Sequence, residues 1–249
     1  MSIILTDAAA ATYTFPANFT VRGIPFKTRS SFVDIAYSAG SKNKGDLKTA
    51  MREIIIEGIV GAADAASFET LRNTIYAWLF KTDLKLSFIA GKHFKVKCIT
   101  NVSPSFFEGG FLRVAKLSFT CQCEDPFQYY DAVSSDNAVI AASPTTWSIT
   151  NAGAYDVYPV ITITNSANNT DFILENITDA NRSFEYIDAA CLNTLVTVID
   201  NTDGTVFMNG ANGVSKFTGN WLRLLPGVNS IKYTGAVCNI DMNWYQREL

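Results

Sequence analysis

The chain contains a single histidine, His93, and this limits the chemistry that its side chains can perform. Metal sites with two or three histidine ligands are excluded, and a Ser-His-Asp triad could use only this residue. Gly-x-Ser-x-Gly, Walker A and Gly-x-Gly-x-x-Gly patterns do not occur. His93 follows a predicted turn, on the polar face of a strand, so we expect it to be solvated. We therefore expect no catalytic residue, no metal site and no cofactor.

Acidic residues offer two further candidate sites. The segment 200–204 (DNTDG) resembles a calcium loop, but it lacks carboxylates at positions one, three and five with glycine at six, so an Asp-Gly hairpin turn is favoured. Glu175, Glu185 and Asp188 could supply the carboxylate pair of a glycoside hydrolase, which needs two acids across a cleft. No pair stands out among them, so a hydrolase is the least favoured function.

Tryptophans could bind a sugar by stacking, which makes a carbohydrate-binding β-sandwich module the alternative function. Trp244 follows the apolar alternation of its strand, which favours the core. Trp147 and Trp221 are both available, and Trp221 is the candidate contact for a sugar or a partner.

The five cysteines do not form the spacing of a disulfide scaffold or a zinc site. Cys121 and Cys123 fall on the apolar face of a predicted strand, where we expect them to act as small hydrophobic residues. The first residues, MSIILTDAAAA, lack the basic start of a signal peptide, and no apolar run reaches the length of a membrane span. We expect a soluble protein, made in the cytoplasm and not inserted in a membrane.

The first half of the sequence predicts strands with one helix. Residues 52–60 form a β-branched run typical of a strand covered on both faces. Asp64 is a plausible N-cap for a helix that ends at 81–83, and its apolar stripe consists of Phe68, Leu71, Ile75, Trp78 and Leu79. Alternation over 84–98, with a turn at 90–92, predicts a hairpin, and a further strand follows at 115–123.

A polar, basic segment at 38–48 interrupts these strands and carries Lys42, Lys44 and Lys48. It is long enough to reach a neighbouring subunit, and these three lysines are the candidate inter-subunit contacts. An ordinary hairpin tip is the other interpretation of the same segment.

The formal net charge of −3 divides unevenly along the chain. Residues 1–130 carry 15 Lys+Arg and 11 Asp+Glu, whereas residues 131–249 carry 5 and 12. This shift predicts a first domain at 1–130, a linker at 131–146 and a second domain at 147–249. Short alternating strands with turns about every ten residues predict a β-sandwich for the second domain.

Several segments, taken in order, resemble the distal tail protein (Dit) family of long-tailed, siphovirus-type bacteriophages. In the first half these are VRGIP at 21–25, REIIIEG at 52–58 before the helix, the hairpin at 84–100, and KLSFTCQCEDPF at 116–127. In the second half they are ITNAG at 149–153, YPVI at 158–161 and LLPGVNSI at 224–231.

The resemblance implies a mainly β protein with one helix. Its N-terminal domain would be a tail-tube-like β-barrel or sheet, and its C-terminal domain a galectin-like β-sandwich. It further implies a hexameric ring at the tail tip of the virion, assembled in the host cytoplasm. The ring would join the tail tube protein to the tail hub and to tail-fibre or receptor-binding proteins. DNA would pass through its lumen without specific binding, and the segment 38–48 would reach a neighbour.

Overall fold

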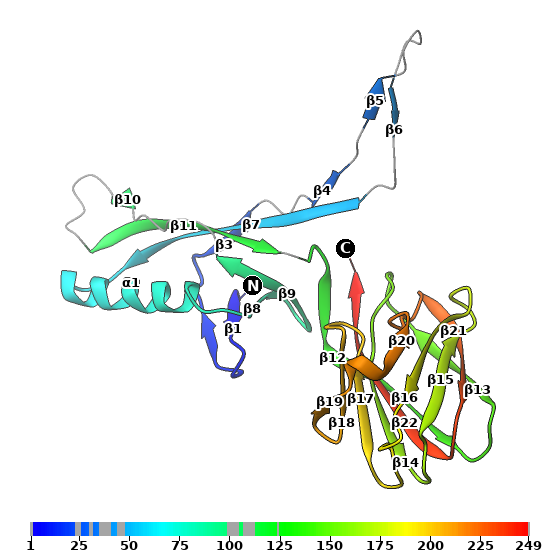
Figure 1. Cartoon of the computed structure of the whole chain (residues 1–249). Coiled ribbons are helices and arrows are strands. Elements are labelled where there is room, and N and C mark those ends of the chain that lie inside the picture. The colour runs from blue at the N-terminus through cyan, green and yellow to red at the C-terminus, as the bar shows by residue number, and fades with distance from the viewer. Residues whose placement is uncertain are drawn as a thin grey trace. The chain divides into compact units, whose positions relative to one another are not determined.

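The computed structural model describes the chain in two compact units, Met1–Gln128 and Tyr129–Leu249, with boundaries close to the predicted change of domain (Figure 1). The residues described are 2–22, 26–29, 32–34, 41–43, 48–98, 105–106, 113–123 and 125–248, with the backbone alone for 26–29, 32–34, 41–43, 48–51, 98 and 106. Each unit has its own hydrophobic core.

The first unit is an open sheet of antiparallel strands with one helix. Its elements are β1 (Ile4–Thr6), β2 (Thr12–Thr14), β3 (Thr20–Arg22), β4 (Phe26–Arg29), β5 (Phe32–Asp34), β6 (Ser41–Asn43), β7 (Lys48–Gly61), α1 (Ala65–Leu79), β8 (Leu84–Ile89), β9 (Lys92–Cys98), β10 (Ser105–Phe106) and β11 (Val114–Cys123). The pair β7–β11 is central, β3 and β4 lie along the other edge of β7, and β5 pairs with β6. The predicted barrel or sheet is therefore a sheet.

The strand β7 is covered on one face rather than on both. Ile54 and Ile56 are fully buried, but Ile55 and Ile59 on the opposite face are 39% and 45% exposed. Glu57 lies between these two isoleucines and is paired with Arg22 and Lys116. The prediction of two covered faces was wrong because a β-branched run satisfies strand propensity whichever face is buried.

The helix α1 begins and ends as predicted. The Asp64 side chain accepts a hydrogen bond from the Ser67 backbone N–H (2.7 Å), which satisfies one of the free donors of the first turn. Phe68, Ile75 and Leu79 are buried in the core of the first unit. At 15 residues α1 is too short to cross a bilayer, and no other helix in the described residues could do so.

The hairpin β8–β9 is confirmed, but its histidine lies in the protein interior. Phe94 and Val96 face the core, as their alternation predicted. His93 is only 3% exposed, so the expected solvated position was wrong. Both faces of β9 are covered at this point, whereas further along it Lys95 and Lys97 are exposed. Alternation assigns a residue to a face but does not say what covers that face.

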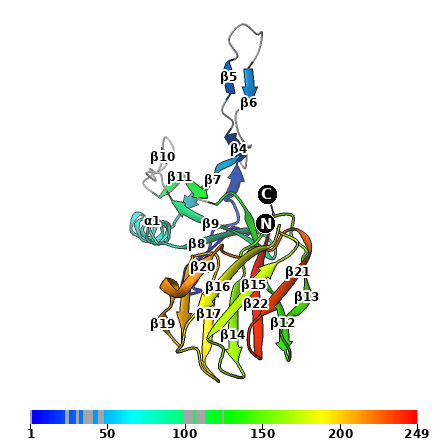
Figure 2. The ribbon, with the colours of Figure 1, turned by 45° about the vertical axis from the view of Figure 1, so that its right-hand side comes forward.

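The second unit is a β-sandwich. Its elements are β12 (Gln128–Ile140), β13 (Thr145–Asn151), β14 (Val160–Asn165), β15 (Asp171–Asn176), β16 (Arg182–Ile187), β17 (Val196–Asp200), β18 (Thr205–Met208), β19 (Ala211–Asn212), the 3-10 turn η1 (Val214–Lys216), β20 (Phe217–Gly219), β21 (Gly227–Thr234) and β22 (Cys238–Glu248). One sheet has the order β13-β21-β15-β16-β20, and the other contains β19-β18-β17-β14-β22-β12 (Figures 1 and 2).

Side chains from both sheets form the sandwich core. Ile161, Ile163, Ile199, Ile240 and Met242 come from one sheet, and Phe172, Leu174, Phe184, Tyr186, Ile231 and Tyr233 from the other. Trp244 is 5% exposed and belongs to this core, as predicted. Trp147 packs against its margin.

The segment predicted as a linker, 131–146, is largely strand. Most of it belongs to β12, and its last two residues begin β13. The Ser, Ala and Asn content that suggested a linker reflects a strand with many exposed positions, on which Ala138 and Ile140 alone reach the core.

Four cysteines, Cys121, Cys123, Cys191 and Cys238, are free thiols with at most 1% exposure. Burial raises the pKa of the Cys123 thiol to about 12. Cys121 and Cys123 lie on the buried face of β11, which confirms their expected place as small apolar residues.

The close approach of β7 to Phe19 gives a stability test. A Cβ at Gly58 would lie 2.4 Å from Cγ of Phe19, whose ring is buried. We expect Gly58→Ala to lower the free energy of unfolding of the first unit by about 1–3 kcal/mol, measured by urea denaturation. Gly61→Ala is the matched control, because its nearest neighbour would be 3.5 Å away. Equal effects of the two changes would contradict this packing.

Candidate functional site

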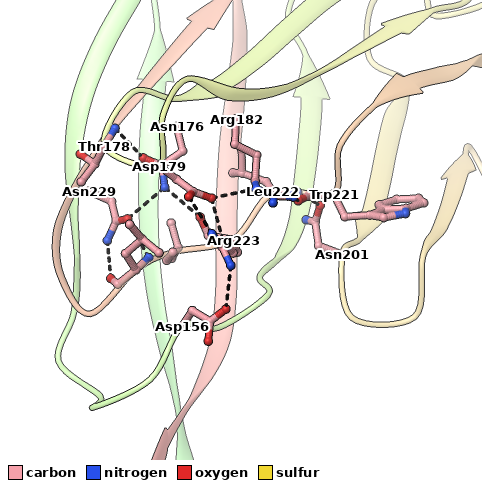
Figure 3. Close-up of polar contacts among 12 residues, drawn as sticks. Asp156, Asn176, Thr178, Asp179, Arg182, Asn201, Trp221, Leu222, Arg223 and Asn229 are labelled. Carbon is pink, nitrogen blue, oxygen red and sulfur yellow. Dashed lines mark hydrogen bonds and ion pairs between the residues drawn. The ribbon is translucent and has the colours of Figure 1, made fainter. Parts of the chain in front are cut away.

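Five charged residues meet at one end of the sandwich and form what we term the Arg223 cluster: Asp156, Asp179, Arg182, Arg223 and Arg247. Arg223 binds Asp179 with two parallel hydrogen bonds, from Nε to Oδ2 (2.8 Å) and from Nη2 to Oδ1 (2.9 Å). Its Nη1 also reaches Oδ2 of Asp156 at 3.4 Å (Figure 3). Arg182 forms a second ion pair with Asp179, from Nε to Oδ2 (2.8 Å). Arg247 pairs with Asp156, from Nη2 to Oδ1 (3.1 Å). Positive and negative groups therefore alternate along the cluster.

The residues of the Arg223 cluster come from separate parts of the chain. Asp179 lies in the turn between β15 and β16, and Arg182 begins β16. Arg223 lies between β20 and β21, Asp156 between β13 and β14, and Arg247 near the end of β22. The cluster thus ties both sheets of the sandwich together at this end.

The charges of the Arg223 cluster stabilise one another. The hydrogen bonds from Arg223 hold the pKa of Asp179 below its usual value, although burial of this carboxyl acts in the opposite direction. The same hydrogen bonds raise the pKa of Arg223. Bidentate pairing of arginine with a mostly buried carboxylate is among the stronger polar interactions in proteins. Asp179 is therefore an ionised structural anchor and not a proton donor.

Four buried asparagines hold the irregular segment 221–226, which precedes β21, beside this cluster. Asn201 accepts from the Leu222 N–H (2.7 Å), and Asn176 donates to the Arg223 carbonyl (2.8 Å). Asn151 donates to the carbonyl of Leu224 (3.1 Å). These amides replace the backbone partners that a regular strand would have provided.

The fourth asparagine, Asn229, binds backbone groups of the turn LLPGVN with its side chain. Its Oδ1 accepts from the Leu225 N–H (2.8 Å), and its Nδ2 donates to the carbonyls of Leu225 (2.7 Å) and Gly227 (3.1 Å). Gly227 has φ +90°, a backbone conformation that favours glycine. Asn176 also donates to Oδ1 of Asn229 (2.9 Å), so the turn whose sequence resembles the Dit family is hydrogen-bonded both within itself and to the end of β15.

Trp221, the candidate sugar contact, lies at the margin of the Arg223 cluster and is already packed. Its carbonyl accepts from Arg182 (3.2 Å), while its ring stacks on Phe217 with centroids 4.1 Å apart. Phe217 stacks in turn on Phe184, and the Gly204 turn lies against the other atoms of the indole. The ring is half-buried and helps fill the margin of the core.

The three acids that the sequence suggested for a hydrolase, Glu175, Glu185 and Asp188, have different surroundings in the structure. Asp188 is buried; burial opposes its ionisation, but Lys216 (2.6 Å) and the Tyr186 hydroxyl outweigh this and lower its pKa. Glu175 pairs with Lys232 (3.2 Å) across neighbouring strands. Glu185 is half-buried on the outer face of β16. Glu175 and Glu185 lie at half-buried positions of neighbouring strands, whereas Asp188 is buried, and no metal-binding group of acids, histidine or cysteines occurs among the described residues.

The segment 200–204 is a hairpin turn, as expected. Asp200 accepts from the backbone N–H groups of Thr202 (2.8 Å) and Asp203 (3.2 Å), and Gly204 has φ +65°.

The side chains of the three candidate lysines are not described. Lys44 lies outside the described residues, and only the backbone is described for Lys42, in β6, and Lys48, in β7.

The basic residues of the second unit are all engaged within it. Its five Lys and Arg each contact a carboxylate of the described chain: Arg182, Lys216, Arg223, Lys232 and Arg247. These pairs use only Asp156, Asp179, Asp188 and Glu175 of its acids. Residues 131–249 carry twelve acidic and five basic residues, so this unit has a net negative charge, and these ion pairs tie its loops and strands together.

Comparison with known proteins agrees with this architecture. Residues 152–247 match the family model of the siphovirus-type tail component, C-terminal domain. The second unit is therefore similar to the C-terminal domain of siphovirus-type tail components. The family is structural and not a family of enzymes.

The similarity in fold extends to both units. The crystal structure of the Dit protein of phage SPP1 matches with a TM-score of 0.76 at 16% sequence identity, and covers 99% of each chain. Its title describes that protein as a paradigm of the hub adsorption apparatus in phages that infect Gram-positive bacteria. No curated protein sequence matches the chain. The predicted fold class, mainly β with one helix and a C-terminal sandwich, is confirmed.

The asparagine that closes the LLPGVN turn gives a second stability test. Asn229→Ala removes four hydrogen bonds, one of them from Asn176, and leaves the Leu225 N–H without its acceptor. We expect the free energy of unfolding of the second unit to fall by about 2–4 kcal/mol, measured by urea denaturation. Val228→Ala, in the same turn and 62% exposed, should change it by less than about 0.5 kcal/mol. A neutral Asn229→Ala would contradict the assigned role of this amide.

The Arg223 cluster also predicts a dependence of stability on pH. Because the folded pKa of Asp179 lies below its unfolded value, its contribution is complete above about pH 5 and is lost as the pH falls below about 4. Asp179→Asn should lower the free energy of unfolding at pH 7 by about 1–3 kcal/mol and reduce its fall between pH 5 and 3. Asp171→Asn, at an exposed position, is the control. Identical pH profiles for wild type and Asp179→Asn would exclude this contribution.

Proposed function

We propose that this protein is a distal tail protein that forms a hexameric ring at the tip of the phage tail. The ring joins the tail tube protein to the tail hub and to tail-fibre or receptor-binding proteins. The observation that carries the proposal is the match of the whole fold to a Dit protein, over 99% of both chains, combined with the family match of the second unit.

The surface of the first unit supports contacts between subunits there. A cyclic ring needs two different complementary patches on each subunit. The open sheet of this unit exposes Ile55 and Ile59 around the ion-paired Glu57. Exposed apolar residues rimmed by charges are typical of protein interfaces.

The remaining partners follow from this position in the virion. DNA passes through the lumen of the ring without specific binding, and the rings assemble in the host cytoplasm before incorporation into the tail. The basic segment 38–48, with Lys42, Lys44 and Lys48, reaches a neighbouring subunit or the tube above. The component performs no reaction and uses no cofactor. A sugar-binding role has less support, because Phe217 occupies a face of the Trp221 ring.

The mass of the purified chain tests the ring. A hexamer has a mass of about 164 kDa, six times the 27.3 kDa of the chain, and its particles should show a central hole in negative stain. A mass that stays at 27.3 kDa at high concentration, with no annular particles, would falsify the proposal.

Charge reversal tests the role of the basic segment. Lys42→Glu, Lys44→Glu and Lys48→Glu together should reduce the fraction of chain in rings, or the joining of rings to tail tubes, at least tenfold. The reason is that each subunit then presents three carboxylates in place of three ammonium groups, and a symmetric ring repeats this change at all six contacts. Lys85→Glu is a control of the same chemistry at a half-buried position of β8. Normal rings and normal joining in the triple variant would assign the segment to an ordinary hairpin tip.

A further inference from the structure

The strand β13 is a long, open edge of the sandwich. It ends the order β13-β21-β15-β16-β20, so β21 is its only neighbour in that sheet (Figure 1). It pairs with β21 at all seven positions, from Thr145 opposite Tyr233 to Asn151 opposite Gly227, with no bulge. Its other side presents backbone N–H and C=O groups with the spacing that accepts another strand.

The protections that natural edge strands carry are missing from β13. Short edges, charges, proline and bulges normally prevent strands from pairing between molecules. Two other edge strands of this sandwich are short: β20 has three residues and β19 has two. By contrast, β13 has seven residues, contains no proline, and lies in a stretch with no charge between Asp136 and Asp156.

The sequence of β13, TTWSITN, is complementary to itself in an antiparallel pair centred on Ser148. On the exposed face Ser148 meets its own copy and Thr146 meets Thr150, so hydroxyls face hydroxyls. On the core side Trp147 meets Ile149 twice, once in each direction. Hydroxyl pairs and aromatic–β-branched pairs are favourable across strands, and no like charges oppose one another.

We propose that β13 is a docking edge for β13 of a second copy of this chain. The two five-stranded sheets then join through an antiparallel pair about a two-fold axis at Ser148. The half-buried Trp147, which packs on the margin of its own core, gains a neighbour on its open side. Such a contact is isologous and closes with two copies, so it is distinct from the heterologous contact that builds a ring.

A charge placed at the centre of the pair tests the proposal. Wild-type full-length chain should double its mass with rising concentration, from monomer to dimer or from ring to paired rings, in sedimentation velocity. Ser148→Lys places two ammonium groups opposite one another and should weaken this doubling at least tenfold. Thr218→Lys makes a similar change on β20, the other edge of the same sheet, and should leave it unchanged. Part of the loss in Ser148→Lys should return at high salt.

Cross-linking tests the register. Opposite residues of an antiparallel pair have Cα atoms about 4.5–5.5 Å apart, within disulfide range. Oxidised Ser148→Cys should therefore give a covalent dimer on a non-reducing gel, above the background of the wild-type chain. Thr146→Cys should not, because its partner is Thr150 rather than itself.

Three outcomes separate this contact from the ring. Hexamers that never double in mass, with no Ser148→Cys dimer, overturn the pairing and leave the ring intact. Dimers with the expected cross-link but no hexamers support the pairing and contradict the ring. A chain that stays unpaired but binds an uncharged extended peptide along β13 overturns the second copy as the occupant.

Discussion

Backbone groups outside regular strands must find partners when they are buried, and this requirement organises the end of the sandwich. The segment 221–226 has a single backbone bridge, between Leu224 and Val157, so several of its other N–H and C=O groups bind side-chain amides instead. Asparagine suits this position because one side chain both donates and accepts. With the segment fixed, Arg223 is held where it can bind Asp179 and Asp156, and the two sheets are joined.

The charges of the second unit follow from the same arrangement. It has five arginines and lysines, and each forms an ion pair with a carboxylate of the same unit. Asp179 and Asp188 are buried, and removing the cation beside a buried carboxylate is costly, so Arg182, Arg223 and Lys216 hold the loops of these two acids in place. What is left for the surface is a surplus of carboxylates, in contrast with the basic first half. The negative charge of the second half therefore goes with a small set of basic residues, each of which pairs with a carboxylate of the same unit.

Local patterns predicted the elements whose causes are local. Asp64 caps the helix as expected, and Leu84 to Cys98 form the hairpin that their alternation indicates. The LLPGVN turn carried a family resemblance before its hydrogen bonds were known. The sequence could not show that His93 is covered on both sides or that Ile55 is open, because the covering segments are distant in the chain. The Arg223 cluster was missed for the same reason: its five members are scattered from Asp156 to Arg247.

Burial protects the thiols of this protein from oxidation. Thiolate is the form of cysteine that oxidises, and burial suppresses it at Cys123 and Cys238 by raising the pKa of each thiol. Cys121 and Cys191 are equally inaccessible to dissolved oxidants. Burial thus keeps these four side chains chemically inert in an oxidising environment, without any reducing enzyme to repair them.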